Sequence, residues 1–498
     1  MTVPYGIHWF RRDLRIAGNP ALQANWRQHQ GRVLGLFAFD RTFLARPDFS
    51  HNRFAFFLQT LQALRTEMQA TGGDLLVLDV GPKDAFQRLF AALHEHNLPL
   101  PATVSFNRDY EPFARQRDAE ITDWLPKSVG VAVHTERDHL LIEPDELTRN
   151  GEPGAFYQVY SPFAKRWFER LRTDAIRERI AAQKSGLAYL DQRRPTKSLF
   201  ALTWSGLFGG DVPLADHLDA CIADNAPRVT VPLPDAGSQA ALARLRAFRK
   251  AGLARYAERR DRPDLDGTSQ LSIYLKNGSI TPAMILAELG LLEADFKQKD
   301  GVTTFLKEIV WREFYYHVLY HRPEVEQTAF LERYRDLAWP NREDWFAAWK
   351  AGETGYPIVD AGMRQLRATG WMHNRVRMIV ASFLTKDLLI DWRRGERYFM
   401  EQLLDGDLAP NNGGWQWAAS TGCDPQPYFR IFNPKLQSEK FDPDGDYIRT
   451  WVPELREVRS KAIHAPHEAG VAVTYPAPIV NHSVQKERAL ALYRLVTQ

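Results

Sequence analysis

Long apolar runs and a secretory leader are both missing from this chain. Although 44% of its 498 residues are hydrophobic, no run of 18 apolar residues occurs, so no segment qualifies as a membrane-spanning helix. The N-terminal residues do not follow the basic and then apolar pattern of a secretory signal, so we expect a cytosolic protein. The two cysteines, Cys221 and Cys423, lie far apart without metal-ligand spacing, which argues against disulfides and zinc.

The chain also has little net charge and no glycine fingerprint for a dinucleotide. Its net charge is +3 and its pI about 8.7, which a solvated surface of mixed sign gives as readily as a nucleic-acid-binding surface. No GxGxxG pattern follows the first strand-like segment, so the sequence does not favour a Rossmann dinucleotide site there. The length predicts two or three domains.

The first part of the chain alternates strand-like and helix-like segments. Short apolar runs typical of buried strands are separated by amphipathic segments such as 51–68 and 84–96. This alternation predicts a Rossmann-like α/β domain over residues 1–136, with a parallel sheet and helices on both faces. The expected strands are 6–12, 32–40, 74–80, 103–109 and 130–136.

The rest of the chain divides into a weakly patterned middle and a helical end. Between residues 137 and 240 the periodicity weakens and Pro and Gly recur, so we expect a long connector that packs on its neighbours. Residues 241–498 show helical patterns almost throughout and should form an all-helical domain. The predicted fold is therefore an α/β domain, a long interdomain connector and an all-α domain.

Residues 352–434 concentrate tryptophan among polar side chains. The segment contains GETGYPIVDAGMRQL, GWMHNRVRM, DWRRGERYF, DGDLAPNNGGWQWAAS and PYFRIFNP, with Trp371, Trp392, Trp415 and Trp417. Large flat side chains with polar edges suit stacking on flat ligands such as flavins and nucleobases. The segment therefore predicts a ligand site.

Two earlier segments have the composition of pocket walls. The TSQLS run at 268–272 precedes a helix-like segment, where hydroxyl and N–H groups either cap the helix or bind a diphosphate. Within TFLKEIVWREFYYH, five residues at steps of three and four mix aromatic and charged side chains on one helix face. Neither a core stripe nor a solvated face needs that mixture. The face consists of Phe305, Glu308, Trp311, Arg312 and Tyr315.

These motifs resemble those of the DNA photolyase/cryptochrome family, and most of all the bacterial class I photolyases that repair cyclobutane pyrimidine dimers. The resemblance covers nearly the whole chain and implies FAD in the helical domain, active in its reduced form. It implies light-driven electron transfer from that FAD to a dimer flipped out of DNA. The alternative is a cryptochrome-type blue-light photoreceptor without repair activity. The MHNR tetrad at 372–375 favours dimer repair.

The resemblance assigns a set of residues to the flavin. Asn411 matches the residue that faces flavin N5, where an amide oxygen can accept a hydrogen bond from the N5 proton, although an Asn-Gly stretch alone is equally typical of a turn. We expect Arg377 to pair with Asp405. The family often has Trp at the position of Phe305. The matched positions are Tyr256, Thr268, Ser269, Gln270, Leu271, Ser272, Phe305, Arg377, Asp405, Gly406, Asp407 and Asn411.

Other matched positions face the lesion and the DNA. Trp311 and Trp417 match the aromatic pair that holds the damaged dinucleotide, and Glu308 matches a carboxyl group that hydrogen-bonds to it and stabilises its electron-bearing form. Arg430 is as typical of a structural ion pair as of a DNA contact. The full set is Arg260, Glu308, Trp311, Arg312, Asn374, Arg375, Met378, Trp417, Arg430 and Gln437.

Three tryptophans match the electron relay of the family. In order from the flavin to the surface they are Trp415, Trp392 and Trp339. The relay reduces oxidised flavin in light and takes no part in the repair step. Each of these residues alone is typical of ordinary core packing.

The family resemblance also raises the question of a second, light-harvesting chromophore. Folate-binding members carry an Asn-Glu pair where YEPFARQRD places Phe113 and Ala114. This departure favours a deazaflavin or FMN over a folate and leaves open that no antenna is bound. The predicted partner is DNA that contains pyrimidine dimers, bound by a monomer with no membrane and no obligate protein partner.

Overall fold

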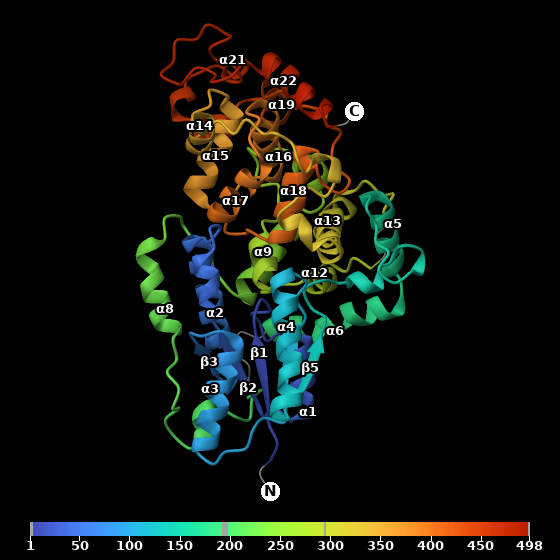
Figure 1. Ribbon diagram of the computed structural model, residues 1–498, viewed down its shortest axis with the longest axis vertical. Coiled ribbons are helices and arrows are strands. Elements are labelled where there is room, and N and C mark those ends of the chain that lie inside the picture. Colours follow the sequence, from blue (N-terminus) through green and yellow to red (C-terminus); the bar gives the residue numbers. More distant parts are fainter. Residues whose placement is uncertain (1–2, 192–197, 293–294, 497–498) are drawn as a thin grey trace.

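A computed structural model describes residues 3–191, 198–292 and 295–496 of the chain (Figure 1). An α/β domain forms one end of an elongated molecule and a helical domain forms the other, with the two termini at opposite ends (Figure 1). No helix in the described part of the chain is long and apolar enough to cross a membrane.

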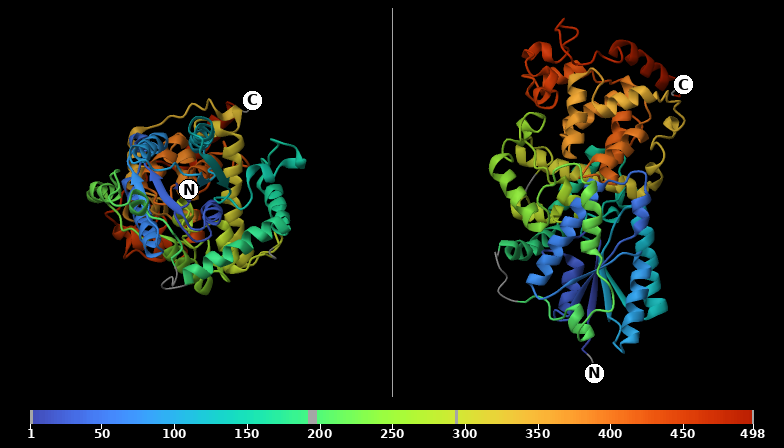
Figure 2. Two further views of the ribbon diagram at one scale, coloured as in Figure 1. Left: turned by 90° about the horizontal axis from the view of Figure 1, so that it is seen from below. Right: turned by 90° about the vertical axis from the view of Figure 1, so that its left-hand side faces the viewer.

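The α/β domain contains a five-stranded parallel sheet in the order β3-β2-β1-β4-β5. Helices lie on both faces of this sheet (Figure 2). β1 to β4 are buried almost throughout, as expected for a sheet covered on both faces, and all five predicted strands are confirmed. The elements are β1 (Gly6–Phe10), α1 (Pro20–Gln28), β2 (Val33–Ala38), α2 (His51–Ala70), β3 (Leu75–Leu78), α3 (Pro82–Glu95), β4 (Thr103–Asn107), α4 (Pro112–Trp124) and β5 (Ala132–Glu136).

The strand order reverses between β1 and β4. β1 pairs with β2 on one side and with β4 on the other, so the chain leaves the carboxyl ends of β1 and β4 in opposite directions. In open parallel sheets, ligands usually bind in the crevice at the carboxyl ends of the strands at such a reversal. Here the loops that follow these two strands contact the helical domain, through Arg12 after β1 and Glu111 after β4.

The helical domain confirms the predicted all-α region. Many of its helices begin at a residue whose side chain caps the first turn, such as Thr281 before Pro282 and Asp300 before Gly301. The main helices are α9 (Ser238–Ala251), α10 (Tyr256–Arg259), α11 (Ser272–Asn277), α12 (Pro282–Leu289), α13 (Gly301–His321), α14 (Glu343–Ala351), α15 (Pro357–Thr369), α16 (Asn374–Ser382), α17 (Trp392–Gln402), α18 (Leu408–Ala419), α19 (Pro434–Phe441), α20 (Asp446–Trp451), α21 (Ser460–Ile463) and α22 (His482–Arg494).

The connector is more ordered than the sequence predicted. It contains α5 (Tyr160–Leu171) and α6 (Asp174–Asp191), followed by the shorter α7 (Trp204–Phe208) and α8 (Leu218–Asn225). The weak periodicity read from the sequence therefore did not predict the two helices in residues 160–191. α5 packs on α13 and α6 packs on α12, so both belong spatially to the helical domain.

The helical pattern of α5 was present but hidden by its surroundings. Its buried side chains recur at steps of three and four, while Pro and Gly cluster just before it. Pro162 lies in the first turn, where its missing N–H has no helical partner to lose. The buried face consists of Tyr160, Phe163, Ala164, Trp167, Phe168 and Leu171. The boundaries at residues 136 and 240 stay a prediction.

Candidate active site

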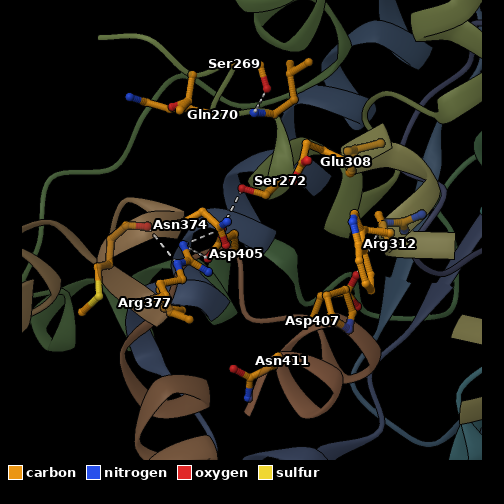
Figure 3. Close-up of a pocket in the computed structure, with 18 of the residues that line it drawn as sticks. Ser269, Gln270, Ser272, Glu308, Arg312, Asn374, Arg377, Asp405, Asp407 and Asn411 are labelled. Atoms are coloured by element: carbon orange, nitrogen blue, oxygen red, sulfur yellow. Dashed lines mark hydrogen bonds and ion pairs between the residues drawn. The ribbon is translucent and has the colours of Figure 1, made fainter. Parts of the chain in front are cut away.

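A cavity of about 480 Å³ lies in the helical domain, walled by α11, α13, α16 and α18. It collects all the residues predicted to contact the flavin and, apart from Arg430 and Gln437, all those predicted to contact DNA or the lesion. Figure 3 labels ten of these side chains around it, contributed by segments between residues 269 and 411. The five-residue face predicted on residues 305–315 lines this cavity in full.

One end of the cavity is a polar loop that leads into α11. Gln270 has a left-handed backbone with φ of 51°, and Leu271 after it is right-handed. Such a pair turns successive N–H groups the same way, an arrangement that binds anions. Arg244 holds the loop from outside, because its Nε donates to the Ser269 carbonyl oxygen at 2.9 Å. The loop therefore suits a phosphate group.

An ion pair crosses the cavity wall beside this loop. Arg377 Nη2 lies 2.9 and 3.1 Å from the two carboxylate oxygens of Asp405, which confirms the predicted pair. Ser272 Oγ donates to the same carboxylate at 2.6 Å. These contacts join α11, α16 and the segment before α18, as Figure 3 shows. They fix the separation of three walls.

Asp407 is the acceptor at the centre of a buried ion cluster. Lys276 Nζ lies 3.3 Å and Arg12 Nη2 2.9 Å from its Oδ1, and Arg312 Nε lies 3.7 Å from Oδ2. The hydroxyl of Tyr316 also donates to Oδ1. Burial alone would raise the pKa of Asp407, but the cations of Lys276, Arg12 and Arg312 outweigh it and hold that pKa well below its usual range.

Asn411 lies in the first turn of α18 with its amide fixed. Its Nδ2 donates to the carbonyl oxygen of Glu396 at 3.1 Å, so the Oδ1 acceptor remains for a ligand. On the same helix Gly414 lines the cavity, and no atom lies within 4 Å of the place where a Cβ would stand. The helix thus offers bare backbone beside an amide acceptor, which leaves room for a flat ring.

The mouth of the cavity combines charged groups with two aromatic rings. Arg260 donates to Glu308, and Arg375 Nη2 donates to Asp261 at 2.8 Å, while Asn374 is exposed. Burial raises the pKa of Glu308, and the neighbouring Arg260 opposes the increase only in part. Trp311 and Trp417 both line the cavity.

Three of the predicted DNA or lesion contacts do not lie at the mouth of the cavity in the way that Arg260 and Glu308 do. Arg312 lines the cavity but is buried and donates to the carbonyl oxygen of His139 at 3.1 Å, beside Asp407, and its contact with DNA or the lesion stays a prediction. Arg430 is exposed, and in the part of the chain that the structure describes no carboxylate pairs with it, so the structural ion pair is not formed. Gln437, on α19, lies outside the cavity wall.

Two of the three relay candidates are buried and the third is half-buried. Trp415 lines the cavity and is 2% exposed, Trp392 is also 2% exposed, and Trp339 is half-buried. Trp392 and Trp415 belong to the same hydrophobic core, and Trp339 packs on that core. A buried pair with a half-buried third member agrees with Trp339 as the outermost residue, and the relay itself stays a prediction.

Comparisons with known proteins agree with this site. Residues 6–183 match the family model described as DNA photolyase, and residues 305–495 match the FAD binding domain of DNA photolyase. A curated relative from Salmonella typhimurium, named deoxyribodipyrimidine photo-lyase, is 40% identical over 99% of this chain and 98% of its own length. The chain belongs to the DNA photolyase family.

Solved photolyases share the whole architecture. A class III photolyase from Agrobacterium tumefaciens has a TM-score of 0.82 at 37% identity, over 100% of this chain and 98% of that chain. An archaeal photolyase from Sulfolobus tokodaii, solved with two FAD molecules, has a TM-score of 0.77 at 30% identity, over 98% and 99% of the two chains. The matched domain assigns FAD as the cofactor.

The cavity of this photolyase family member fits FAD on three observations. The loop at 268–271 suits the diphosphate, the bare backbone at Gly414 leaves room for a planar ring, and Asn411 keeps an acceptor for a ring N–H. The volume is in the range of cofactor sites. Phe305 lines the cavity and meets the ring of Tyr256 edge-on, with the ring centroids 5.6 Å apart.

Sequence reasoning missed the partners of Asp407. Arg12, Lys276 and Tyr316 complete the ion cluster, yet Arg12 is 395 residues away from Asp407 in the chain. Its only signal was a basic turn at the carboxyl end of the first strand, which is a usual ligand position in parallel sheets.

Proposed function

We propose that this protein repairs cyclobutane pyrimidine dimers in DNA in a light-dependent reaction, as a deoxyribodipyrimidine photo-lyase. One observation carries the proposal: a single cavity holds both the flavin-fitting residues and the aromatic and carboxyl groups suited to a flipped dinucleotide. A lesion that enters the mouth therefore comes to the flavin without an intervening wall.

Each part of the cavity would have a defined task. Bound FAD in its reduced form would absorb blue light, supply the electron that opens the cyclobutane ring and take that electron back after the ring has opened, so that no net redox change occurs. Trp311 and Trp417 would stack on the extruded pyrimidines and exclude water. Glu308 would donate a hydrogen bond to the dimer, and Arg260 would hold the Glu308 carboxyl group in place.

The alternative, a blue-light photoreceptor without repair activity, is less well supported. A receptor needs the flavin but has no need of an acid and two tryptophans at the mouth of the flavin cavity. Here Glu308, Trp311 and Trp417 all face that space. The family models and the curated relative carry the photolyase description as well.

A binding and release assay tests the proposal. The holoprotein with reduced FAD should bind an oligonucleotide with one thymine dimer more tightly in the dark than the same oligonucleotide without it. Blue light should release it, because the repaired strand no longer offers an extruded dinucleotide. Equal binding of both oligonucleotides, or a complex that persists in light, would favour the receptor alternative.

We also propose that a flavin or deazaflavin antenna binds in the α/β domain. A second cavity of about 260 Å³ lies at the carboxyl ends of β2 and β3, with Phe43 and Phe54 in its wall. Arg41 and Asp79, paired across it, offer polar contacts to a ring. At the position of the folate-type Asn-Glu pair, Phe113 is 54% exposed and Ala114 is buried, so neither can bind a folate through a polar side chain.

Chromophore extraction tests the antenna. The protein should release FAD and a second flavin-type compound, and reconstitution with FMN should quench the FMN fluorescence by energy transfer. Asp79→Leu should lose the second compound but keep FAD. Release of a folate would overturn this proposal and leave the repair function untouched. A monomeric state, a cytosolic location and the absence of a protein partner remain predictions.

A further inference from the structure

Trp311 has a stacking partner from the connector. The ring centroids of Tyr160 and Trp311 are 3.5 Å apart and the ring planes differ by 2°. Tyr160 is 7% exposed and does not line the cavity, whereas Trp311 is half-buried and does. Tyr160 therefore covers one face of the Trp311 indole. The rest of the indole surface can contact a ligand in the cavity.

Tyr160 is itself held by hydrogen bonds of its hydroxyl and of its backbone N–H. Its hydroxyl donates to the carbonyl oxygen of Lys307 at 3.0 Å, one helical turn before Trp311 on α13. Its backbone N–H donates to the Asp424 carboxylate at 2.9 Å, in the segment that follows α18. Cys423 Sγ donates to the carbonyl oxygen of Gln158 at 3.1 Å. The start of α5 is thus bound both to α13, which carries Trp311, and to the segment that follows α18, the helix that carries Trp417.

Neighbouring aromatic rings complete the support. Phe314 meets the Trp311 ring edge-on with centroids 5.7 Å apart, and Tyr315 lies tilted at 5.6 Å. Of these three rings only Tyr160 lies parallel to the indole and covers its face, whereas Phe314 and Tyr315 meet it at an angle. The orientation of Trp311 in the described structure therefore depends on Tyr160.

We propose that Tyr160 is a positioning residue for the lesion, which fixes the plane of Trp311 before the dinucleotide arrives. This inference rests on the proposed repair function. A ring already held in its binding orientation loses less conformational freedom when a base stacks on it. The stack of Tyr160 on Trp311 should therefore increase the affinity for dimer-containing DNA. It makes no contact with the reacting atoms, so the yield of repair per absorbed photon at saturating DNA should not change.

The test compares five variants of the FAD-bound protein: Tyr160→Ala, Tyr160→Leu, Tyr160→Phe, Trp311→Ala and the control Tyr157→Ala. Tyr157 lies in the same segment but packs on Phe163, with ring centroids 6.2 Å apart. Fluorescence anisotropy in the dark gives the Kd for dimer-containing and undamaged oligonucleotides. Absorbance gives the FAD content, and repair at saturating DNA gives the yield.

Tyr160→Ala should raise the Kd for dimer-containing DNA by about threefold to tenfold, the range expected for one aromatic pair, with little change for undamaged DNA. The yield and the FAD content should stay the same. Tyr160→Phe keeps the stack and should remain within about twofold of the unaltered protein. Tyr157→Ala should bind both oligonucleotides normally.

Three results would overturn the inference, each in a different way. If Trp311→Ala weakens binding and Tyr160→Ala does not, the positioning role is wrong and the repair function stands. If Trp311→Ala leaves the preference for dimers unchanged, the lesion assignment of Trp311 fails and the inference fails with it. If Tyr160→Ala and the bulkier Tyr160→Leu both lose FAD, Tyr160 serves the fold and not the lesion.

Discussion

Arg12 Nη2 lies 2.9 Å from Asp407 Oδ1, so a residue of the α/β domain reaches the wall of the flavin cavity. The other end of the guanidinium binds Glu111 Oε1 at 2.6 Å, and Glu111 also lies 3.5 Å from Lys276 Nζ. The α/β domain is thereby an electrostatic part of the active site as well as the domain proposed to carry an antenna.

Arg12→Ala should loosen both the domain interface and the cofactor. Breaking one partner of a buried pair typically costs about 3–5 kcal/mol, and because Lys276 and Arg312 stay beside Asp407 we expect about 2–3 kcal/mol. Urea unfolding and the rate of FAD release measure the two effects. Arg27→Ala, at an exposed position on α1, is the control. Equal midpoints for both variants would contradict the role of the Arg12–Asp407 pair.

Glu396 should make stability depend on pH. Burial raises the pKa of Glu396 to about 8, and its carboxyl accepts from Asn412 Nδ2 at 3.0 Å. The folded protein keeps this proton when the unfolded chain, with a pKa near 4.5, has lost it. The stability contributed by the neutral acid is therefore complete below about pH 4.5 and is lost as pH rises through 8.

Glu396→Gln separates ionisation from packing, because the amide keeps an acceptor for Asn412 and cannot ionise. The variant and the unaltered protein should be about equally stable at pH 5, and the variant should be about 2–4 kcal/mol more stable at pH 8, with no further gain at pH 9. Urea unfolding at the three pH values measures this. A stability difference that does not change with pH would show that Glu396 ionises normally in the folded state.

Trp392→Phe should block photoreduction and spare repair. The residue is 2% exposed and belongs to the same hydrophobic core as the cavity-lining Trp415, and phenylalanine keeps most of the packing but is far harder to oxidise. Oxidised FAD should be reduced by blue light and an external thiol at least about tenfold more slowly, followed by its absorbance. Protein with chemically reduced FAD should still repair DNA.

Trp349→Phe is the matched control for the relay. Trp349 is also fully buried and its ring centroid lies 6.1 Å from that of Trp415, but it has no place in the predicted relay. Its replacement should leave photoreduction unchanged. If Trp349→Phe slows photoreduction as much as Trp392→Phe does, the electron leaves the cavity by another route.

Glu308→Gln should lower the yield of repair more than the affinity for DNA. The amide still fills the space beside Arg260, but it donates a weaker hydrogen bond than a protonated carboxyl group. We expect the yield per photon to fall about twofold to tenfold, with the Kd within about twofold. Actinometry and anisotropy measure the two quantities. An unchanged yield would remove Glu308 from the chemistry.

The site was predictable where its residues belong to short motifs or to one helix face. The face with Phe305, Glu308 and Trp311 follows from helical spacing, and the pair of Arg377 with Asp405 follows from the motifs that carry them. The contact of Arg12 with Asp407 depends on how two domains dock, which no local pattern encodes. The stack of Tyr160 on Trp311 was missed for the same reason.

The fold was predictable to a similar degree. Parallel strands such as β1 and β2 show as short apolar runs because both faces of the sheet are covered. The helix α5 was missed because its pattern contains Pro162 and follows a segment with Gly151, Pro153 and Gly154, and these residues are typical of loops when read alone. Its partner on α13 supplies the packing that makes it a helix.

The decisive measurement is chromatography of an oligonucleotide with one thymine dimer after incubation with the purified protein and fully reduced FAD, in blue light and in the dark. Light-dependent return of two intact thymines, with no change in the dark, is the result that dimer repair in this cavity predicts. Bound and reduced FAD with no return of thymine in light would contradict it, and a six-four substrate would then distinguish another lesion from a receptor.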